Sequence, residues 1–310
     1  MSAPHGWLIL DKPVGLGSTQ AVGAVKRNLR EAGYGKVKTG HGGTLDPLAS
    51  GVLPIALGEA TKLAGRMLES DKVYEFTVQF GRETDSLDLE GSVVARSDVQ
   101  PGFGAVESIL EQQFIGEIDQ IPPAYSAIMI DGRRAYDLAR AGEQVAMKSR
   151  RVRVGPWRYI AEGFAGDWDA SEQFATLGVT VSKGTYIRSL ARDIARALGT
   201  VGHVTHLRRT RAGPFGLDAA ITLDNLNAIG QGAALENSLL PLEAGLDGIP
   251  ALDLGPEQAR AVHQGRVLTG LTFQDGVCWA RYGDRPLALM QVAGGNATVL
   301  RGFNLHDTAE

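Results

Sequence analysis

The chain has 310 residues, a formal net charge of -4, and 44% hydrophobic and 21% charged residues, an ordinary globular composition with ample material for a core. No apolar run is long enough to span a membrane, and the early run at residues 7–10 is too short for the core of a signal peptide. The single cysteine, Cys278, excludes an intramolecular disulfide and fits a reducing compartment, so we expect a cytoplasmic protein.

The first half of the chain predicts strands and helices in alternation. The apolar run at residues 7–10 is typical of a buried strand, and residues 19–30 have helical spacing with Ser18 as a candidate N-cap. A second buried strand is expected at residues 52–57. Residues 73–80 alternate polar and apolar side chains, which predicts a strand with Tyr74 on its apolar face.

The second half continues this alternation without a repeat of fixed period or low-complexity sequence. We expect helices at 105–114, 133–141 and 256–263, and strands at 152–160, 174–181, 277–281, 287–292 and 297–301. The pattern therefore indicates the α/β class, as a mixed α+β core whose sheet is largely antiparallel.

The clearest helix is predicted at residues 185–198, where apolar side chains follow helical spacing and Gly199 suits the C-terminal end. Arg188, Arg192 and Arg196 are four residues apart and form one stripe along it. Such a stripe is either a solvated face or a functional one. We expect Arg188 to face a site and the other two arginines to lie nearer solvent or phosphate.

Charge is unevenly distributed along the chain. Residues 69–119 are rich in acids, whereas residues 183–211 carry seven Lys and Arg residues against one acid, Asp193. A second basic run lies at residues 148–158. Basic runs are usually solvated faces, but two of them in a chain of negative net charge favour a phosphate-binding surface.

The segment at residues 40–55, GHGGTLDPLASGVLPI, is the most informative of the chain. Pro47 biases Asp46 toward an extended backbone, and the preceding glycines allow another segment to approach closely. A lone carboxylate presented in such a loop, with His41 five residues before it, is a candidate nucleophile or base. The alternative is that Asp46 only braces a turn.

This segment resembles the signature of the bacterial tRNA pseudouridine-55 synthases of the TruB type. Further blocks resemble the same family in the same order: GWLILDKPVG at 6–15, DKVY at 71–74, IPPAYSA at 121–127, GRRAY at 132–136, SKGTYIR at 182–188 and HVTHLRR at 203–209. The ordered set is far more specific than any single block. Two features depart from the family: Met129 stands where a lysine is common, and residues 28–39 are a few residues longer than usual.

The resemblance implies two domains. A pseudouridine synthase catalytic domain would span residues 1–247, and a small C-terminal β-barrel of the PUA type, an RNA-binding module, would span residues 248–310. A change in composition around residues 241–250 and the Gly-rich turns beyond it agree with this division. The alternative is a β-rich extension that merely packs on the core.

The family's reaction breaks the bond between uracil N1 and the ribose, turns the base and rejoins it through C5. No electrons are lost overall, so we expect no cofactor. The implied substrate is the T-arm stem-loop of tRNA, whose position-55 uridine must be flipped out at a cost of about a few kcal/mol. We expect a monomer that works without a guide RNA and without a membrane.

The resemblance assigns the catalytic roles to Asp46, Tyr74 and Arg188. Asp46 would attack the sugar, attack the uracil ring or remove a sugar proton, and the sequence does not choose among these routes. Arg188 would pair with Asp46 and favour its ionised form, or else contact phosphate. Tyr74 would stack on the uracil and assist proton removal from C5, although ordinary core packing explains its position equally well.

Four further residues are expected to bind the substrate. By resemblance, Tyr186 and Leu207 would wall the uracil pocket and His41 would hold the disrupted RNA loop. Lys12 would either position the Asp46 loop or contact phosphate. In each case the alternative is an ordinary structural residue.

Other readings of the chain remain open. It might be a non-catalytic RNA binder or tRNA-folding factor, a small-molecule hydrolase that uses Asp46 and His41, or a guide-RNA-dependent relative of the family. No metal is expected, because His203 and His206 have a possible ligand spacing but lie in an extended or turning segment without nearby cysteines.

Overall fold

A mixed sheet dominates the protein, whose computed structural model describes residues 3–143, 145–165 and 172–305. Its strands are β1 (Gly6–Lys12), β2 (Thr39–His41), β3 (Ser50–Leu57), β4 (Lys72–Phe80), β7 (Gly116–Gln120), β10 (Arg150–Ala165), β11 (Glu172–Val181), β12 (Gly202–Ala212), β13 (Phe215–Gly216) and β14 (Leu239–Leu240). They follow the order β14-β1-β3-β12-β4-β11-β10-β7, with β2 paired to β3 and β13 to β12. Among the described residues, β3 with β12 is the one parallel pairing of this sheet, so the predicted, largely antiparallel α+β core is confirmed.

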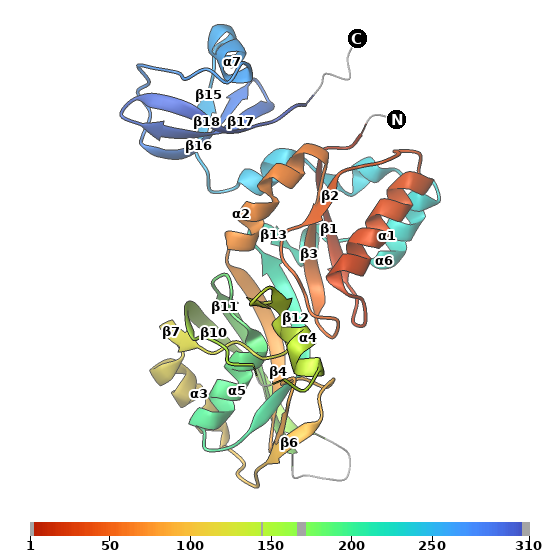
Figure 1. Ribbon diagram of the computed structural model, residues 1–310, viewed down its shortest axis with the longest axis vertical. Coiled ribbons are helices and arrows are strands. Elements are labelled where there is room, and N and C mark those ends of the chain that lie inside the picture. Colours follow the sequence, from red (N-terminus) through yellow and green to blue (C-terminus); the bar gives the residue numbers. More distant parts are fainter. Residues whose placement is uncertain (1–2, 144, 166–171, 306–310) are drawn as a thin grey trace.

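Helices cover the sheet in two groups, and each group has its own hydrophobic core (Figure 1). The helices are α1 (Ser18–Glu31), α2 (Ala64–Glu69), α3 (Phe103–Gln113), α4 (Ala135–Arg140), α5 (Ile187–Ala197) and α6 (Leu223–Gly230). Helices α1 and α6 pack against β1 and β3, whereas α3 and α5 pack against β4, β10, β11 and β12. Tyr74 and Leu207 contact both cores, which places them at the boundary between the two halves of the sheet.

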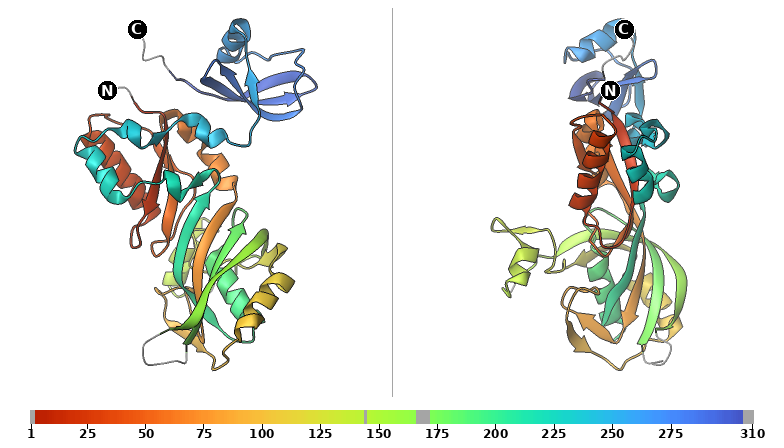
Figure 2. Two further views of the ribbon diagram at one scale, coloured as in Figure 1. Left: turned by 180° about the vertical axis from the view of Figure 1, so that it is seen from behind. Right: turned by 90° about the vertical axis from the view of Figure 1, so that its right-hand side faces the viewer.

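Two hairpins extend from this body. One pairs β5 (Arg82–Thr84) with β6 (Val93–Arg96), and the other pairs β8 (Met129–Ile130) with β9 (Arg133–Arg134). The second hairpin and α4 project away from the sheet, as the side view in Figure 2 shows. Asp131 and Gly132 both have positive φ, at 48° and 81°, which is the requirement of a tight two-residue turn. This turn makes Arg133 and Arg134 a strand, so the expected helix at 133–141 is wrong in its first two residues.

The C-terminal part forms a separate layer with its own small core (Figure 1). It contains β15 (Ala251–Asp253), α7 (Pro256–His263), β16 (Gly276–Tyr282), β17 (Arg285–Ala293) and β18 (Asn296–Gly302). The strands form one sheet in the order β15-β16-β17-β18. Within the described residues this sheet does not close, so the expected barrel is not confirmed. The layer packs on the body through Trp279, Leu289 and Phe303, which share a cluster with Trp7.

One predicted role is wrong in an instructive way. Helix α1 begins at Ser18 itself and its N-cap is Gly17, so Ser18 is not the cap. Its hydroxyl instead accepts a hydrogen bond from the Leu45 N–H at 2.8 Å and donates one to the Leu45 carbonyl at 2.9 Å. Ser18 therefore holds the chain immediately before Asp46. No helix in the described residues combines the length and apolar character needed to cross a membrane.

Candidate active site

Asp46 lies in the loop between β2 and β3, and buried side chains hold this loop from both sides. On one side is Lys12, whose side chain is fully buried. Its ammonium group donates to the carbonyls of Pro13 at 2.9 Å, Leu16 at 2.6 Å and Pro47 at 3.3 Å. These bonds fix the residue after Asp46, and they favour the first of the two roles predicted for Lys12. Burial lowers the pKa of Lys12 to about 8, although the nearby Asp46 opposes this shift.

Arg209 holds the other side of the loop. It is almost fully buried on β12, and its guanidinium group donates to the carbonyls of Gly43 at 3.1 Å, Thr44 at 3.3 Å and Val52 at 2.8 Å. Its Nη1 also lies 3.5 Å from the Tyr74 hydroxyl. Sequence reasoning placed Arg209 in a basic run, but here it is a structural cation that ties the loop to β3 and Tyr74.

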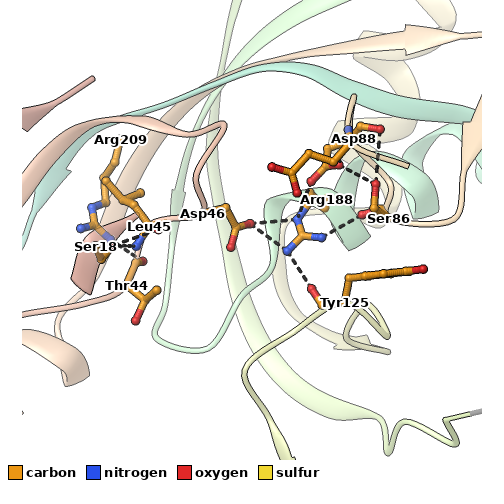
Figure 3. A network of polar contacts seen from close by, with 10 residues as sticks. Ser18, Thr44, Leu45, Asp46, Ser86, Asp88, Tyr125, Arg188 and Arg209 are labelled. Carbon is orange, nitrogen blue, oxygen red and sulfur yellow. Dashed lines mark hydrogen bonds and ion pairs between the residues drawn. The ribbon is translucent and has the colours of Figure 1, made fainter. Parts of the chain in front are cut away.

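Arg188 forms an ion pair with Asp46 (Figure 3). Its Nε lies 2.9 Å and its Nη2 2.8 Å from Oδ2 of Asp46. The remaining contacts are Nη1 to the Ser86 carbonyl at 2.8 Å, Nη2 to the Tyr125 carbonyl at 3.0 Å and Nε to Asp88 Oδ2 at 3.6 Å. The expected pairing of Arg188 with Asp46 is therefore present, and Asp88 is a second carboxylate that sequence reasoning missed.

The two side chains of this pair differ in exposure. Arg188 is 6% exposed and Asp46 is 36% exposed. The buried guanidinium thus acts as a fixed support, and the carboxylate faces open space. Both contacting nitrogens of Arg188 bind the same oxygen, Oδ2, which leaves Oδ1 available for another group.

A cavity of about 320 Å³ collects five of the predicted site residues: Asp46, Tyr74, Tyr186, Arg188 and Leu207. This size is typical of a pocket for a small ligand. A second cavity of about 420 Å³ lies on the other side of the Asp46–Arg188 pair, next to the projecting hairpin, and includes Asp85, Tyr125 and Arg140. The ion pair therefore stands between two connected openings, one walled by aromatic and aliphatic side chains.

Tyr186 is held in the cavity wall by a residue that sequence reasoning missed. The Gln120 side chain, which is fully buried, accepts from the Tyr186 N–H at 2.8 Å and donates to the Tyr186 carbonyl at 3.1 Å. Arg150 covers the Tyr186 ring, with its guanidinium carbon 4.6 Å from the ring centroid. The two partners lie 66 and 36 positions away from Tyr186 in the chain, so no local pattern indicates them.

Comparisons with known proteins agree with this geometry. Residues 29–187 match the family model described as TruB family pseudouridylate synthase (N terminal domain), and residues 188–247 match that of the tRNA pseudouridylate synthase B C-terminal domain. The chain belongs to the TruB family of pseudouridylate synthases. The resemblance read from the sequence motifs is thereby confirmed.

Individual relatives cover nearly the whole chain. It is 68% identical to a tRNA pseudouridine synthase B of Novosphingobium aromaticivorans over 98% of this chain and 99% of the relative. It is 56% identical to that of Zymomonas mobilis over 97% of each chain. Among solved structures, a chain in an H/ACA RNP bound to a substrate RNA containing 2′-deoxyuridine is 25% identical, with a TM-score of 0.70 over 98% of this chain and 86% of the other.

His41 lies at the end of β2, outside the residues that line either cavity beside the ion pair. It is half-buried, and its Nδ1 accepts weakly from the Gly43 N–H at 3.4 Å. Burial, and then the charge of Arg209, lowers the pKa of His41. A hydrolase that pairs Asp46 with His41 is therefore not supported, because the two side chains do not share a cavity.

The two acidic and basic parts of the sequence meet in the fold. Ion pairs join Lys183 to Glu69, Arg153 to Asp71, Arg158 to Glu75 and Arg196 to Glu83. Exposed pairs of this kind contribute little to stability, so a phosphate can compete for the cations. The predicted basic surface stays a prediction, with less unpaired charge than the sequence indicated.

The arginine stripe of α5 behaves partly as expected. Arg188 faces the site, and the Arg196 side chain is 56% exposed. Arg192 is only 12% exposed, because its Nε binds Asp193 at 2.8 Å and its Nη2 binds the Ile121 carbonyl at 2.9 Å. The expectation that Arg192 lies near solvent is wrong, since the segment after β7 crosses this face of the helix.

The two histidines with ligand-like spacing do not converge. His203 is buried, with Nδ1 2.9 Å from the Arg82 carbonyl, whereas His206 is exposed on the same strand. Across the part of the chain that the structure describes, no three His, Cys, Asp or Glu side chains are placed to hold a metal ion.

Proposed function

We propose that this protein isomerises the T-loop uridine of tRNA, at position 55, to pseudouridine, with Asp46 as the catalytic group. The main support is the Asp46–Arg188 ion pair, which leaves one carboxylate oxygen free beside a cavity walled by Tyr74, Tyr186 and Leu207. The names of the most similar relatives, tRNA pseudouridine synthase B, support the choice of tRNA.

The free oxygen of Asp46 is the group available for chemistry. Attack on the sugar, attack on the uracil ring and removal of a sugar proton all require an ionised carboxylate within reach of the nucleotide. Arg188 supplies a permanent positive charge that stabilises this form. Because Arg188 is itself fixed by the carbonyls of Ser86 and Tyr125, the carboxylate does not need to be oriented anew in each turnover.

The walls of the cavity keep the detached uracil in place while it turns. Tyr74 offers a ring face for stacking, and its hydroxyl is the nearest phenol to the C5 proton that must leave. Tyr186, fixed by Gln120, and Leu207 complete an apolar enclosure that excludes water. His41 would contact the opened RNA loop from outside this enclosure.

The protein would act as a monomer without a guide RNA. Its relatives with 68% and 56% identity are named as tRNA-modifying enzymes, whereas its match to the H/ACA RNP chain is 25% identical. Residues 1–247 would form the catalytic domain, and residues 248–310 a PUA-like RNA-binding module. The end of the second family match at residue 247 supports this boundary.

The test is conversion of an unmodified tRNA transcript by the purified protein, without added metal or nucleotide. Chemical mapping should locate pseudouridine at one T-loop uridine. The absence of conversion at stoichiometric enzyme would exclude the assignment. A substrate in which position 55 is cytidine should remain unmodified, and a second modified site would show that the specificity is broader than proposed.

A further inference from the structure

Arg150, the first residue of β10, lines the same cavity as Asp46 and stacks on Tyr186. It also lies against Gly184, where an added Cβ would be 3.5 Å from Arg150 Nη1. The positive φ of Gly184, 78°, and this contact together shape the loop that leads into α5. Arg150 is thus held between the aromatic wall of the cavity and the loop that precedes Arg188.

The cations around this cavity differ in how their donors are used. Arg188 and Arg209 each direct all three guanidinium nitrogens to acceptors of the protein. Lys72 donates to three backbone carbonyls. Arg150 makes no hydrogen bond or ion pair within the described residues, and its Nε and Nη2 are buried without an acceptor.

The charge of Arg150 is also uncompensated. Asp46 is the only carboxylate among the residues that line this cavity, and it is already paired with Arg188. A buried cationic donor without a partner is costly, so it is kept where a ligand supplies the acceptor. A planar guanidinium group with several free N–H donors fits a phosphate better than a single uncharged carbonyl.

We infer that Arg150 binds a phosphodiester oxygen adjacent to the nucleotide whose base enters the Asp46 cavity. The inference rests on the proposed function, because it takes the ligand to be an RNA strand. Stacking on Tyr186 holds the guanidinium group beside the base pocket, so the same contact positions the backbone while the base is enclosed. Arg150 is in this sense a substrate-binding residue that the sequence motifs did not identify.

The experiment compares Arg150→Gln and Arg150→Lys with Arg151→Gln. The control residue is the next in the chain, but its side chain is 68% exposed and lies near Glu117 and Asp119. Each variant binds two T-arm stem-loops: one with natural phosphates, and one with neutral methylphosphonates on both sides of the target uridine. Conversion of the natural RNA by the wild-type protein is checked first, so failure of the proposed function is seen separately.

On natural RNA, Arg150→Gln should raise Kd about tenfold to a hundredfold and reduce the slope of log Kd against log salt by about 0.7 to 0.9. Arg150→Lys should lie between this variant and the wild type, because it keeps the charge but loses the fork. On the neutral RNA, Arg150→Gln and the wild type should bind within about twofold of each other. Arg151→Gln should show no such dependence on the flanking linkages.

An equal loss on both RNAs would overturn the inference, because it would mean that Arg150 only supports Tyr186. A Kd unchanged by Arg150→Gln would overturn it as well. Thermal unfolding of each variant shows whether it is folded. If Arg150→Gln is unfolded, Arg150→Lys decides the question, since its loss of affinity must still disappear on the neutral RNA.

Discussion

Arg188 grips Asp46 by one oxygen only: its Nε and Nη2 lie 2.9 Å and 2.8 Å from Oδ2, and Oδ1 is free of both (Figure 3). A guanidinium group that bound both oxygens would shield the carboxylate from a substrate. The one-sided contact stabilises the negative charge and leaves a reactive oxygen exposed. This relationship makes the pair suited to chemistry as well as to structure.

Replacement of Asp46 by Asn should abolish conversion and preserve RNA binding. The amide keeps the shape of the side chain but has no basic or nucleophilic oxygen, so we expect kcat to fall by at least about a thousandfold. Removal of a negative charge from the cavity should leave the Kd for tRNA unchanged or slightly lower. Single-turnover conversion and filter binding measure the two quantities, with Asp119→Asn, on the exposed edge strand, as the control. Residual conversion near the wild-type rate would mean that another group is the catalyst.

Replacement of Arg188 by Lys keeps the charge but loses the planar fork. The carbonyls of Ser86 and Tyr125 would lose charged donors, so the free energy of unfolding should fall by about 1–3 kcal/mol. Activity should fall at least tenfold, because Asp46 is then less firmly oriented. Arg196→Lys is the matched control on the same helix, where an ion pair with an exposed arginine should contribute less than about 1 kcal/mol. Urea unfolding and initial rates test both variants, and equal losses in the two would contradict the special role of Arg188.

Lys12 predicts a particular pH dependence of stability. Burial lowers its folded-state pKa to about 8 from the model value of 10.5. Between these values the unfolded chain binds more protons than the folded one, so this residue makes the free energy of unfolding rise with pH. Its contribution to the slope is at most about 1.4 kcal/mol per pH unit. Urea unfolding at pH 7.5 to 10 should therefore show a smaller slope for Lys12→Met than for the wild type, whereas Lys26→Met, at an exposed position, should not change it.

Gly51 should be irreplaceable for a reason that the cavity residues do not reveal. Its φ is 103°, and a Cβ there would lie 2.1 Å from the Arg209 carbonyl oxygen, where β3 pairs with β12. Gly51→Ala should reduce the free energy of unfolding by more than about 3 kcal/mol, from strain and collision together. Gly15→Ala is the control, since Gly15 has a φ of 87° but open space around it, and should cost about 1–2 kcal/mol. Similar losses for the two would show that β3 and β12 move apart easily.

Much of the fold was predictable because periodicity is a local property. The alternation at residues 73–80 predicts β4 and the apolar face that carries Tyr74, and the expected helix at 256–263 coincides with α7. Errors arise where a local pattern competes with a turn or a distant partner. Ser18 has the chemistry of a cap, but the backbone of Leu45 takes its hydroxyl.

By itself, the sequence determined the elements, the family and the membership of the site, because the motifs around Asp46, Tyr74 and Arg188 stand within short local blocks. Only the tertiary structure decided how these blocks meet. It placed Tyr74 and Leu207 at the boundary of two cores, gave Arg188 a second carboxylate in Asp88, and left Arg150 without a partner. These features depend on the pairing of strands and helices far apart in the chain, and no spacing along the chain encodes which donor meets which acceptor.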